Sequence, residues 1–348
     1  MKEKAKILTG LPGRMLAVLP LAGFLSACSL VREDLPACPS PVVELRFVYD
    51  YNMEFANAFH NQVDCLSAYI FDNDGFLVAM EKVTDRALLS DEDWRMRPEL
   101  PEGDYHVIAY GGMDCEQSSF SRTTLETGSR KTDLHVQLHP ACLTDDARRR
   151  LHNHYYGAAD FSVNLGEDTR ATVSMMRNTN SIQVALQHLD GSPVDCNDFT
   201  FEIADDNNDF DHENNLLATG EITYKPWNTD NRGTGGKEDA SSWNAALAQF
   251  TTSRLVLPTA ANGKQTGTSL HVRRASDGET VFRIPLLYYM LLFKHDNSGA
   301  GLDGMGDQEY LDRENSWNFV FFLDNNNFWV RTRLVINDWE VRLNGTDM

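Results

Sequence analysis

The side chains that could bind a metal ion lie in two acidic stretches. In Asp205–Glu213, carboxylate and amide oxygens recur at every second residue: Asp205, Asn207, Asp209 and Asp211. Such oxygens are the ligands that Ca²⁺ prefers, but the stretch lacks the glycine at the sixth position and the glutamate at the twelfth of an EF-hand loop. We therefore expect a solvated loop here, with a bound ion as the alternative. In Phe71–Val78, Asp-Gly stands between alternating apolar runs, which predicts a β-hairpin with Gly75 at positive φ rather than a metal site.

The histidines lack the partners that a metal site needs. His152 and His154 are two residues apart in a stretch that we expect to be helical, so they would not face one metal ion. His135 and His139 would share one face of a strand, without an acidic or cysteine partner nearby. We interpret all four as structural histidines and predict no metal site.

Glycine-rich motifs and nucleophiles give no enzymatic signal either. Gly299–Gly304 has the letters of a dinucleotide-binding motif, but no helix start follows it. Gly233–Lys237 lacks the first glycine of a phosphate-binding loop and the Ser or Thr after its lysine. The sequence contains no Gly-x-Ser-x-Gly motif and no nucleophile with a recognisable base. We therefore predict that the protein is not an enzyme and holds no cofactor.

The clearest chemical signal is the thiol of Cys28. A positively charged head, an apolar run (Met15–Leu25) and two small residues precede it, an order typical of a secretory signal peptide. The apolar run is shorter than the roughly 20 residues that span a bilayer. Leu25–Cys28 resembles the bacterial lipobox, in which the cysteine is acylated and becomes the new N-terminus. We expect a lipoprotein signal peptide at 1–27 and a chain anchored by acyl groups on Cys28, with a soluble secreted protein as the alternative.

The net charge restricts the possible partners. The chain has 51 acidic and 31 basic residues, a net charge of −20. Without residues 1–27, which hold four basic residues and one acidic residue, the net charge is −23. Such a surface repels nucleic acid and anionic membranes. We therefore predict no nucleic-acid partner and a membrane contact that depends on lipid, not on charge.

Five further cysteines follow Cys28, and their pairing stays open. Their odd number allows at most two disulfides and one free thiol, and their spacings match no zinc-binding pattern. They are Cys38, Cys65, Cys115, Cys142 and Cys196.

Short strands between turns must position these residues. Alternating apolar residues predict the following strands: Val42–Tyr49, Cys65–Phe71, Tyr105–Tyr110, Leu134–Leu138, Ala171–Met176, Ser181–Leu186, Phe199–Ile203, Arg254–Leu257, Ser269–Arg273, Trp317–Leu323 and Phe328–Ile336. Helical periodicity is rare, and the clearest expected helices are Asp145–His154 and Pro285–Phe293. A polar break at Tyr155–Asp160 separates two groups of strands.

This pattern predicts an all-β protein with short helices. A mature chain of this length usually has more than one core, so we expect two β-sandwich domains in tandem. Residues 28–40 would form a lipidated linker, 41–156 the N-terminal domain and 157–348 the C-terminal domain.

A series of short segments runs through the mature chain: Cys28–Pro39, Leu45–Asp50, Asn52–Phe59, Tyr69–Gly75, Leu100–Tyr105, Tyr110–Gly112, Met176–Ile182, Ile222–Pro226, Tyr310–Arg313 and Val335–Trp339. In this order the series resembles the fimbrillin-associated anchor and accessory subunits of Bacteroides-type fimbriae. The resemblance implies two transthyretin-like domains, a lipoprotein on the surface of the outer membrane, and a role in anchoring or assembling fimbriae for cell adhesion. Its partners would be fimbrial stalk and accessory subunits. The long polar insertion at 227–248 departs from the family.

The alternative function is glycan binding by a lipid-anchored surface protein. Trp227, Trp243 and Trp329 would then form a stacking platform. Otherwise we expect Trp329 in the core and the other two in loops.

The last predicted strand, within Phe328–Arg342, has two possible roles. It could complete the sheet of a stalk subunit, since fimbrial subunits of several kinds polymerise by strand addition. We favour closure of its own domain, because Leu334 and Ile336 would otherwise lie on an aggregation-prone edge.

Overall fold

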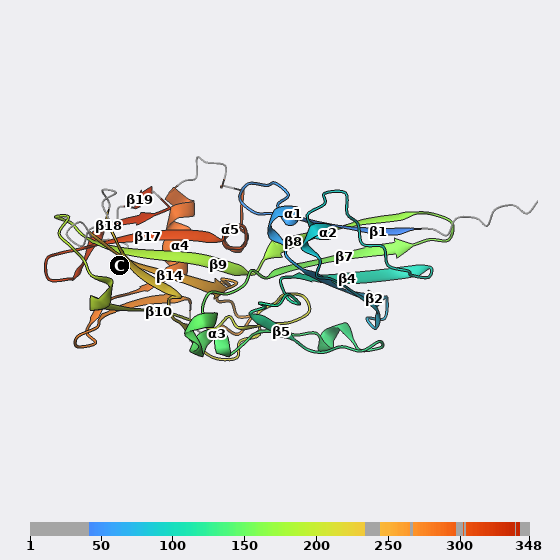
Figure 1. Cartoon of the computed structure of the whole chain (residues 1–348), viewed down its shortest axis with the longest axis horizontal. Coiled ribbons are helices and arrows are strands. Elements are labelled where there is room, and N and C mark those ends of the chain that lie inside the picture. Colours follow the sequence, from blue (N-terminus) through green and yellow to red (C-terminus); the bar gives the residue numbers. More distant parts are fainter. Residues whose placement is uncertain are drawn as a thin grey trace, which may run out of the picture. The chain divides into compact units, whose positions relative to one another are not determined.

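The computed structural model describes residues 42–233, 244–264, 267–296, 302, 304–337 and 339–341. They belong to one compact unit that begins at Pro41. Within these residues the chain forms four β-sheets and a few short helices (Figure 1). The prediction of an all-β sandwich protein is confirmed. No helix in the described ranges has the length and apolar character needed to cross a membrane.

The first sheet has six strands. Its spatial order is β1 (Val43–Tyr51), β8 (Thr169–Arg177), β7 (Tyr155–Val163), β4 (Gly103–Gly111), β2 (Leu66–Asp72) and β3 (Leu77–Val83). Only β1 and β8 pair in parallel. The predicted hairpin at Gly75 is confirmed, since β2 and β3 pair in antiparallel and Gly75 has a φ of +80°.

Both faces of this sheet are covered. On one face, Phe47 and Val107 pack into a core that Phe59 of α1 (Phe59–Gln62) and Leu89 of α2 (Arg86–Leu89) complete. The opposite face packs against a small sheet with the order β11 (Asp209–Phe210), β6 (Val136–Leu138) and β5 (Phe120–Arg122). The first sandwich therefore includes β11, a strand from the second half of the chain.

The second sandwich consists of the other two sheets. One has the order β13 (Asn228–Arg232), β14 (Ala245–Ser253), β9 (Thr179–His188), β17 (Ser316–Leu323), β18 (Trp329–Ile336) and β19 (Trp339–Val341). The other has the order β12 (Ile222–Tyr224), β10 (Phe199–Asp205), β15 (Ser269–Arg274) and β16 (Thr280–Pro285). Only β9 and β17 pair in parallel.

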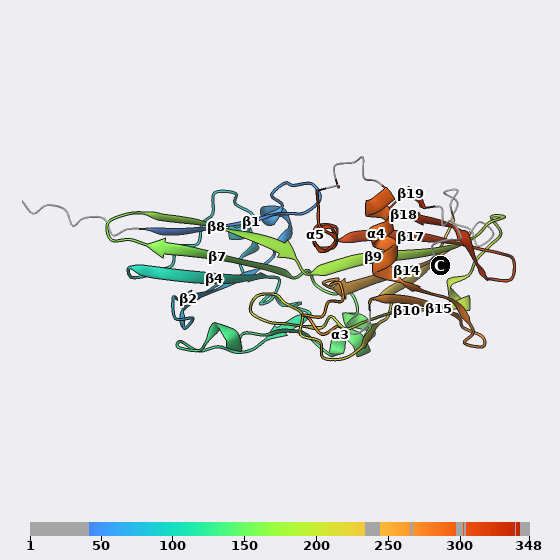
Figure 2. The ribbon, with the colours of Figure 1, turned by 180° about the vertical axis from the view of Figure 1, so that it is seen from behind.

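The helices lie at the connections. α4 (Leu286–Asp296) follows β16 and is the orange helix of Figure 2, which confirms the predicted helix. It buries Leu287 and Met290 in the core. α5 (Asp307–Arg313) precedes β17. The remaining turns are α3 (Ala141–Thr144), η1 (Lys131–Asp133), η2 (Asp146–Arg148) and η3 (Cys196–Asp198).

The predicted polar break at Tyr155–Asp160 is wrong. This segment begins β7, which pairs with both β4 and β8, and Tyr155 and Gly157 are buried. The expected domain boundary at 156/157 therefore falls inside a strand. The chain changes from the first sheet to the second sandwich at Asn178, between β8 and β9.

Two other expected elements do not form. Only η2 appears within the helix expected at Asp145–His154, because side chains from other elements bind the following backbone: Thr251 Oγ1 accepts from Leu151 N, and Ser119 Oγ accepts from His152 N. The strand expected at Arg254–Leu257 is absent. There, Gln308 of α5 takes the place of a neighbouring strand and bonds to the backbone of Leu255 and Leu257.

Candidate functional site

The predicted lipidation residue, Cys28, lies outside the described residues, as does Cys38. Acylation of Cys28 therefore stays a prediction. Cys65 and Cys115 form a disulfide, whereas Cys142 and Cys196 are free and buried. Burial raises the pKa of both free thiols, so neither has the thiolate character that a reactive cysteine requires.

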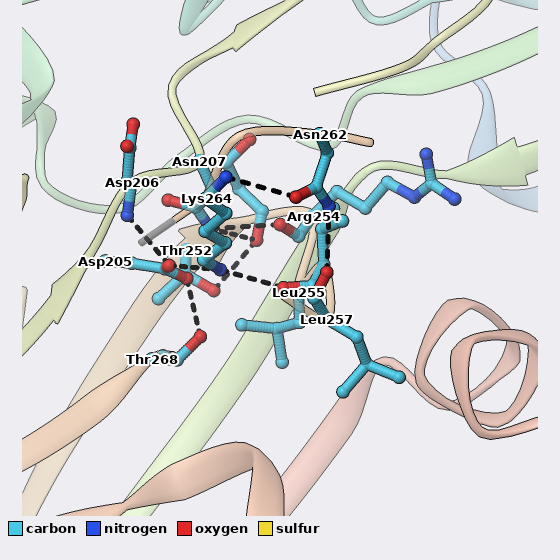
Figure 3. A network of polar contacts seen from close by, with 12 residues as sticks. Asp205, Asp206, Asn207, Thr252, Arg254, Leu255, Leu257, Asn262, Lys264 and Thr268 are labelled. Carbon is cyan, nitrogen blue, oxygen red and sulfur yellow. Dashed lines mark hydrogen bonds and ion pairs between the residues drawn. The ribbon is translucent and has the colours of Figure 1, made fainter. Parts of the chain in front are cut away.

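The acidic stretch at Asp205 is not the solvated loop that we expected. Asp205 ends β10 with its carboxylate buried, and Lys264 Nζ lies 2.5 Å from Asp205 Oδ1 with neither side chain exposed (Figure 3). Thr268 Oγ1 donates to Asp205 Oδ2 at 2.7 Å, and Lys264 Nζ also donates to the carbonyl oxygen of Val256 at 2.8 Å. Burial raises the pKa of Asp205, and the Lys264 ammonium opposes that rise. Both oxygens of this carboxylate therefore already contact protein groups.

The neighbouring polar residues are also used internally. Asn207 donates to the carbonyl oxygens of Ser253 and Arg254, and the hydroxyl of Tyr224 donates to Asn207 Oδ1 at 2.8 Å. Asp206 Oδ1 accepts from the backbone N–H of Thr219. The segment is thus a folded polar network, and in the described ranges no three His, Cys, Asp or Glu residues are grouped to hold a metal ion.

The histidines occupy separate environments. His154 is buried between the rings of Tyr110 and Phe120, with centroid distances of 5.7 and 4.6 Å. Burial lowers its pKa to about 3, so it is neutral at ordinary pH. His139 Nδ1 accepts from the backbone N–H of Ala141, beside α3.

Polar and cationic contacts join the two sandwiches. Arg177, at the end of β8, donates to Asn153 Oδ1 at 2.8 Å and to Asn315 Oδ1 at 3.1 Å. Asn315 in turn donates to the hydroxyl of Tyr49 on β1 at 2.9 Å. Arg313 of α5 lies over the ring of Tyr51, 4.0 Å from its centroid. Since these residues come from both halves of the chain, the joint is built from side chains as well as backbone.

Two rows of polar side chains cross β14, β9 and β17 on the face opposite the core, where Thr251 is itself buried and bonded to the backbone of Arg149 and Leu151. We call Gln249, Gln183 and Asn318 the amide row and Thr251, Ser181 and Ser316 the hydroxyl row, after their cross-strand register. The alternate residues, among them Val184 and Phe319, fill the core. The rows therefore form the floor of an open groove with a volume of about 190 Å³.

Trp227 and Arg150 border this groove. Trp227 precedes β13, where its backbone N–H donates to the carbonyl oxygen of Gln249 at 2.9 Å. The guanidinium of Arg150 lies over the Trp227 ring, 4.8 Å from the centroid. Of the three tryptophans considered for glycan binding, Trp227 lies on this groove. Trp329 packs against the core, as we expected if it takes no part in glycan binding. Trp243 lies outside the described residues.

The C-terminal strand closes its own domain. β18 pairs with β17 on one side and with β19 on the other. Leu334 and Ile336 are fully buried. The favoured prediction is confirmed within the described residues.

Comparisons with known proteins agree with this architecture. The family model described as fimbrillin-A associated anchor proteins Mfa1 and Mfa2 matches residues 35–345. A solved Bacteroides thetaiotaomicron protein described as an adhesin is 42% identical, with a TM-score of 0.81, and the match covers 88% of this chain and 100% of that chain. A Bacteroides ovatus protein, also described as an adhesin, is 26% identical with a TM-score of 0.70 and coverage of 90% and 98%. None of the curated proteins matches.

The fimbrial anchor protein Mfa2 from Porphyromonas gingivalis has a TM-score of 0.63 at 15% identity, with coverage of 88% of this chain and 100% of that chain. At this identity the likeness shows a common fold.

Proposed function

Because the chain belongs to the family of fimbrillin-A associated anchor proteins, we propose that it is an outer-membrane lipoprotein that anchors fimbriae or assists their assembly, without catalysis. The match of the family model to residues 35–345 is the observation that carries this proposal. A role in fimbriae and in adhesion at the cell surface follows from the family and from its adhesin relatives. Stalk and accessory subunits of the fimbria would be its protein partners.

The joint between the sandwiches suits a protein that transmits force. An anchor has to transmit force from the fimbria to the membrane without unfolding at the connection between its domains. Arg177 makes hydrogen bonds to Asn153 and Asn315, and Arg313 lies over Tyr51. Charge-assisted hydrogen bonds and cation–π contacts of this kind restrict the movement of the two halves.

Lipidation would supply the membrane contact. The mature chain carries a strong negative charge, so acyl chains on Cys28 are the attractive component, at about 0.8 kcal/mol per buried methylene group. Cys28→Ser should give an unlipidated precursor that leaves the detergent phase in a Triton X-114 partition and no longer incorporates a palmitate analogue. Cys38→Ser is the matched control and should keep both properties. A Cys28→Ser protein that still enters the detergent phase would contradict the lipid anchor.

The partner claim needs a separate experiment. The tagged chain, expressed in a fimbriated Bacteroides-type cell, is purified from crosslinked membranes, and the proteins that accompany it are identified by mass spectrometry. We expect fimbrial stalk or accessory subunits in stoichiometric amounts. Recovery of the chain without any fimbrial subunit would refute the anchor function, whatever the state of Cys28.

A further inference from the structure

We propose that the groove over the amide and hydroxyl rows binds a saccharide that carries a carboxylate. Its floor spans three adjacent strands, and Trp227 and Arg150 stand at its border. Sites for drug-sized ligands usually enclose about 300–1,000 Å³. A groove of about 190 Å³ is therefore matched to one sugar ring rather than to a whole oligosaccharide.

The floor offers unused hydrogen-bonding groups. Gln249 donates to Gln183 Oε1 at 3.3 Å, which leaves Gln183 Nε2 without a protein partner in the described part of the chain. In the same part, the side-chain amide of Asn318 has no protein partner either. Each planar amide carries donors and an acceptor side by side, a pattern that suits the adjacent hydroxyl groups of a sugar ring. The amides on β9 and β17 thus present this pattern at neighbouring positions.

Trp227 supplies an apolar surface beside these polar groups. The guanidinium of Arg150 lies over its indole ring in the structure. On binding, the weakly positive C–H face of a sugar ring would take that place on the negative π face and leave the guanidinium to the carboxylate of the sugar. The backbone bond from Trp227 to Gln249 fixes the start of β13 next to the amide row. A ring that packs on Trp227 would therefore have its hydroxyl groups within reach of that row.

Arg150 gives the groove a preference for a negatively charged ligand. Its side chain is exposed, and among the described residues no carboxylate lies within ion-pair distance of it. The preceding arginine, Arg149, is instead paired with Asp146 at 2.5 Å. An unpaired guanidinium favours a carboxylate, to which it can donate two parallel hydrogen bonds. On a chain with a net charge of −20, this local positive charge is what would hold an anionic sugar.

A neighbouring cleft has room for the further sugar rings of an oligosaccharide. Arg150 also lines a larger hollow of about 600 Å³, which contains Asp64, Glu116 and Ser118. The carboxylates of Asp64 and Glu116 repel a second anionic sugar. We therefore place the acidic ring beside Trp227 and Arg150, with neutral rings extending toward Ser118.

The test uses the full mature chain and a glycan array of sialosides and uronate oligosaccharides, each with its neutral counterpart, such as sialyllactose and trigalacturonate with their methyl esters. The best ligand is then titrated by calorimetry. We expect carboxylated glycans to bind and their neutral counterparts to bind roughly tenfold more weakly, the factor expected for one charge-assisted hydrogen bond. Affinity should fall further with added salt.

Variants locate the site. Trp227→Ala, Arg150→Gln and Gln183→Ala should each weaken binding of the carboxylated glycan by roughly tenfold, and Arg150→Gln should also remove the preference over the neutral glycan. Tyr288→Ala, at an aromatic side chain with 42% exposure, and Arg170→Ala, with 78% exposure, are the matched controls. All variants should keep the melting temperature of the parent chain.

Three results would overturn the proposal. They are the absence of any carboxylated ligand on the array, equal affinity for charged and neutral counterparts, and binding that survives both Trp227→Ala and Arg150→Gln.

Discussion

Lys264 and Asp205 form an ion pair in which neither side chain has any exposed surface, with 2.5 Å between Nζ and Oδ1. The pair joins the end of β10 to the segment before β15, and Thr268 completes the contacts of the carboxylate. A carboxylate in such a site depends on its cation, because burial alone would penalise its charged form.

Replacing Lys264 with methionine should destabilise the protein by about 3–5 kcal/mol, since it leaves Asp205 buried without its partner. Urea denaturation followed by circular dichroism measures this loss. The double variant Asp205→Asn/Lys264→Met should recover most of it, because no buried charge remains. The exposed pair of Arg232 and Asp230 is the control, and Arg232→Ala should cost at most about 1 kcal/mol. A Lys264→Met variant as stable as that control would contradict the structural role of the pair.

His154 should make folding sensitive to acid. Burial lowers its pKa from 6.5 to about 3, so below pH 6.5 the unfolded chain binds a proton that the folded chain does not. Stability from this group is therefore complete above pH 6.5 and is lost, by about 1.4 kcal/mol per pH unit, as the pH falls toward 3.

The variant His154→Phe isolates this effect. Phenylalanine keeps the packing against Tyr110 and Phe120 and has no ring nitrogens, whereas those of His154 have no hydrogen-bond partner among the described residues. The stability difference between variant and parent should grow as the pH is lowered from 6.5 to 4. A constant difference between His154→Phe and parent across this range would refute the prediction.

The Cys65–Cys115 disulfide closes a loop with a sequence separation of 50 residues. The double variant Cys65→Ala/Cys115→Ala should lose about 4 kcal/mol, the chain-entropy value for a loop of this length. Denaturation of the parent with and without dithiothreitol should give the same loss. Reductant should have no effect on the double variant, since Cys142 and Cys196 are free thiols. A parent equally stable in both conditions would mean that the disulfide contributes nothing.

Closure of the second sandwich by β18 can be tested at Leu334. Leu334→Ala should cost about 2–5 kcal/mol, because it removes a fully buried side chain from the core. Phe328→Ala, just before the strand and with 46% exposure, should change stability by less than about 1 kcal/mol. Deletion of residues 328–348 should abolish the cooperative melt of the second sandwich. A deletion variant that still melts cooperatively would show that this strand is dispensable for folding.

Local pattern was sufficient for much of the fold. Alternation predicted strands such as Phe199–Ile203 and Trp317–Leu323, because residues two apart lie on the same face of a strand and one face is buried. The turn at Gly75 followed from Asp-Gly between two such runs, since glycine adopts positive φ without strain. The closure by β18 followed from the cost of exposing Leu334 and Ile336.

Local pattern failed where distant residues supply the missing partners. Tyr155–Asp160 looks polar and irregular, yet it pairs on both sides within a sheet. The segment after Asp146–Arg148 has helical composition, but Thr251 and Ser119 bind its backbone. Asp205 looks like a loop carboxylate, and only Lys264, which lies far along the chain, makes its burial possible.

The sequence by itself determined which residues favour strands and turns, which residues could carry a lipid, and which family the chain resembles. The candidate groove was decided by tertiary structure. Gln183 and Asn318 are adjacent only because β9 and β17 pair in parallel, and Arg150, which precedes β7, meets Trp227, which precedes β13, only in the folded chain. Periodicity reports which side of a strand faces the core, but it carries no information on which strand lies next to it, because register is fixed by contacts between residues far apart in the chain.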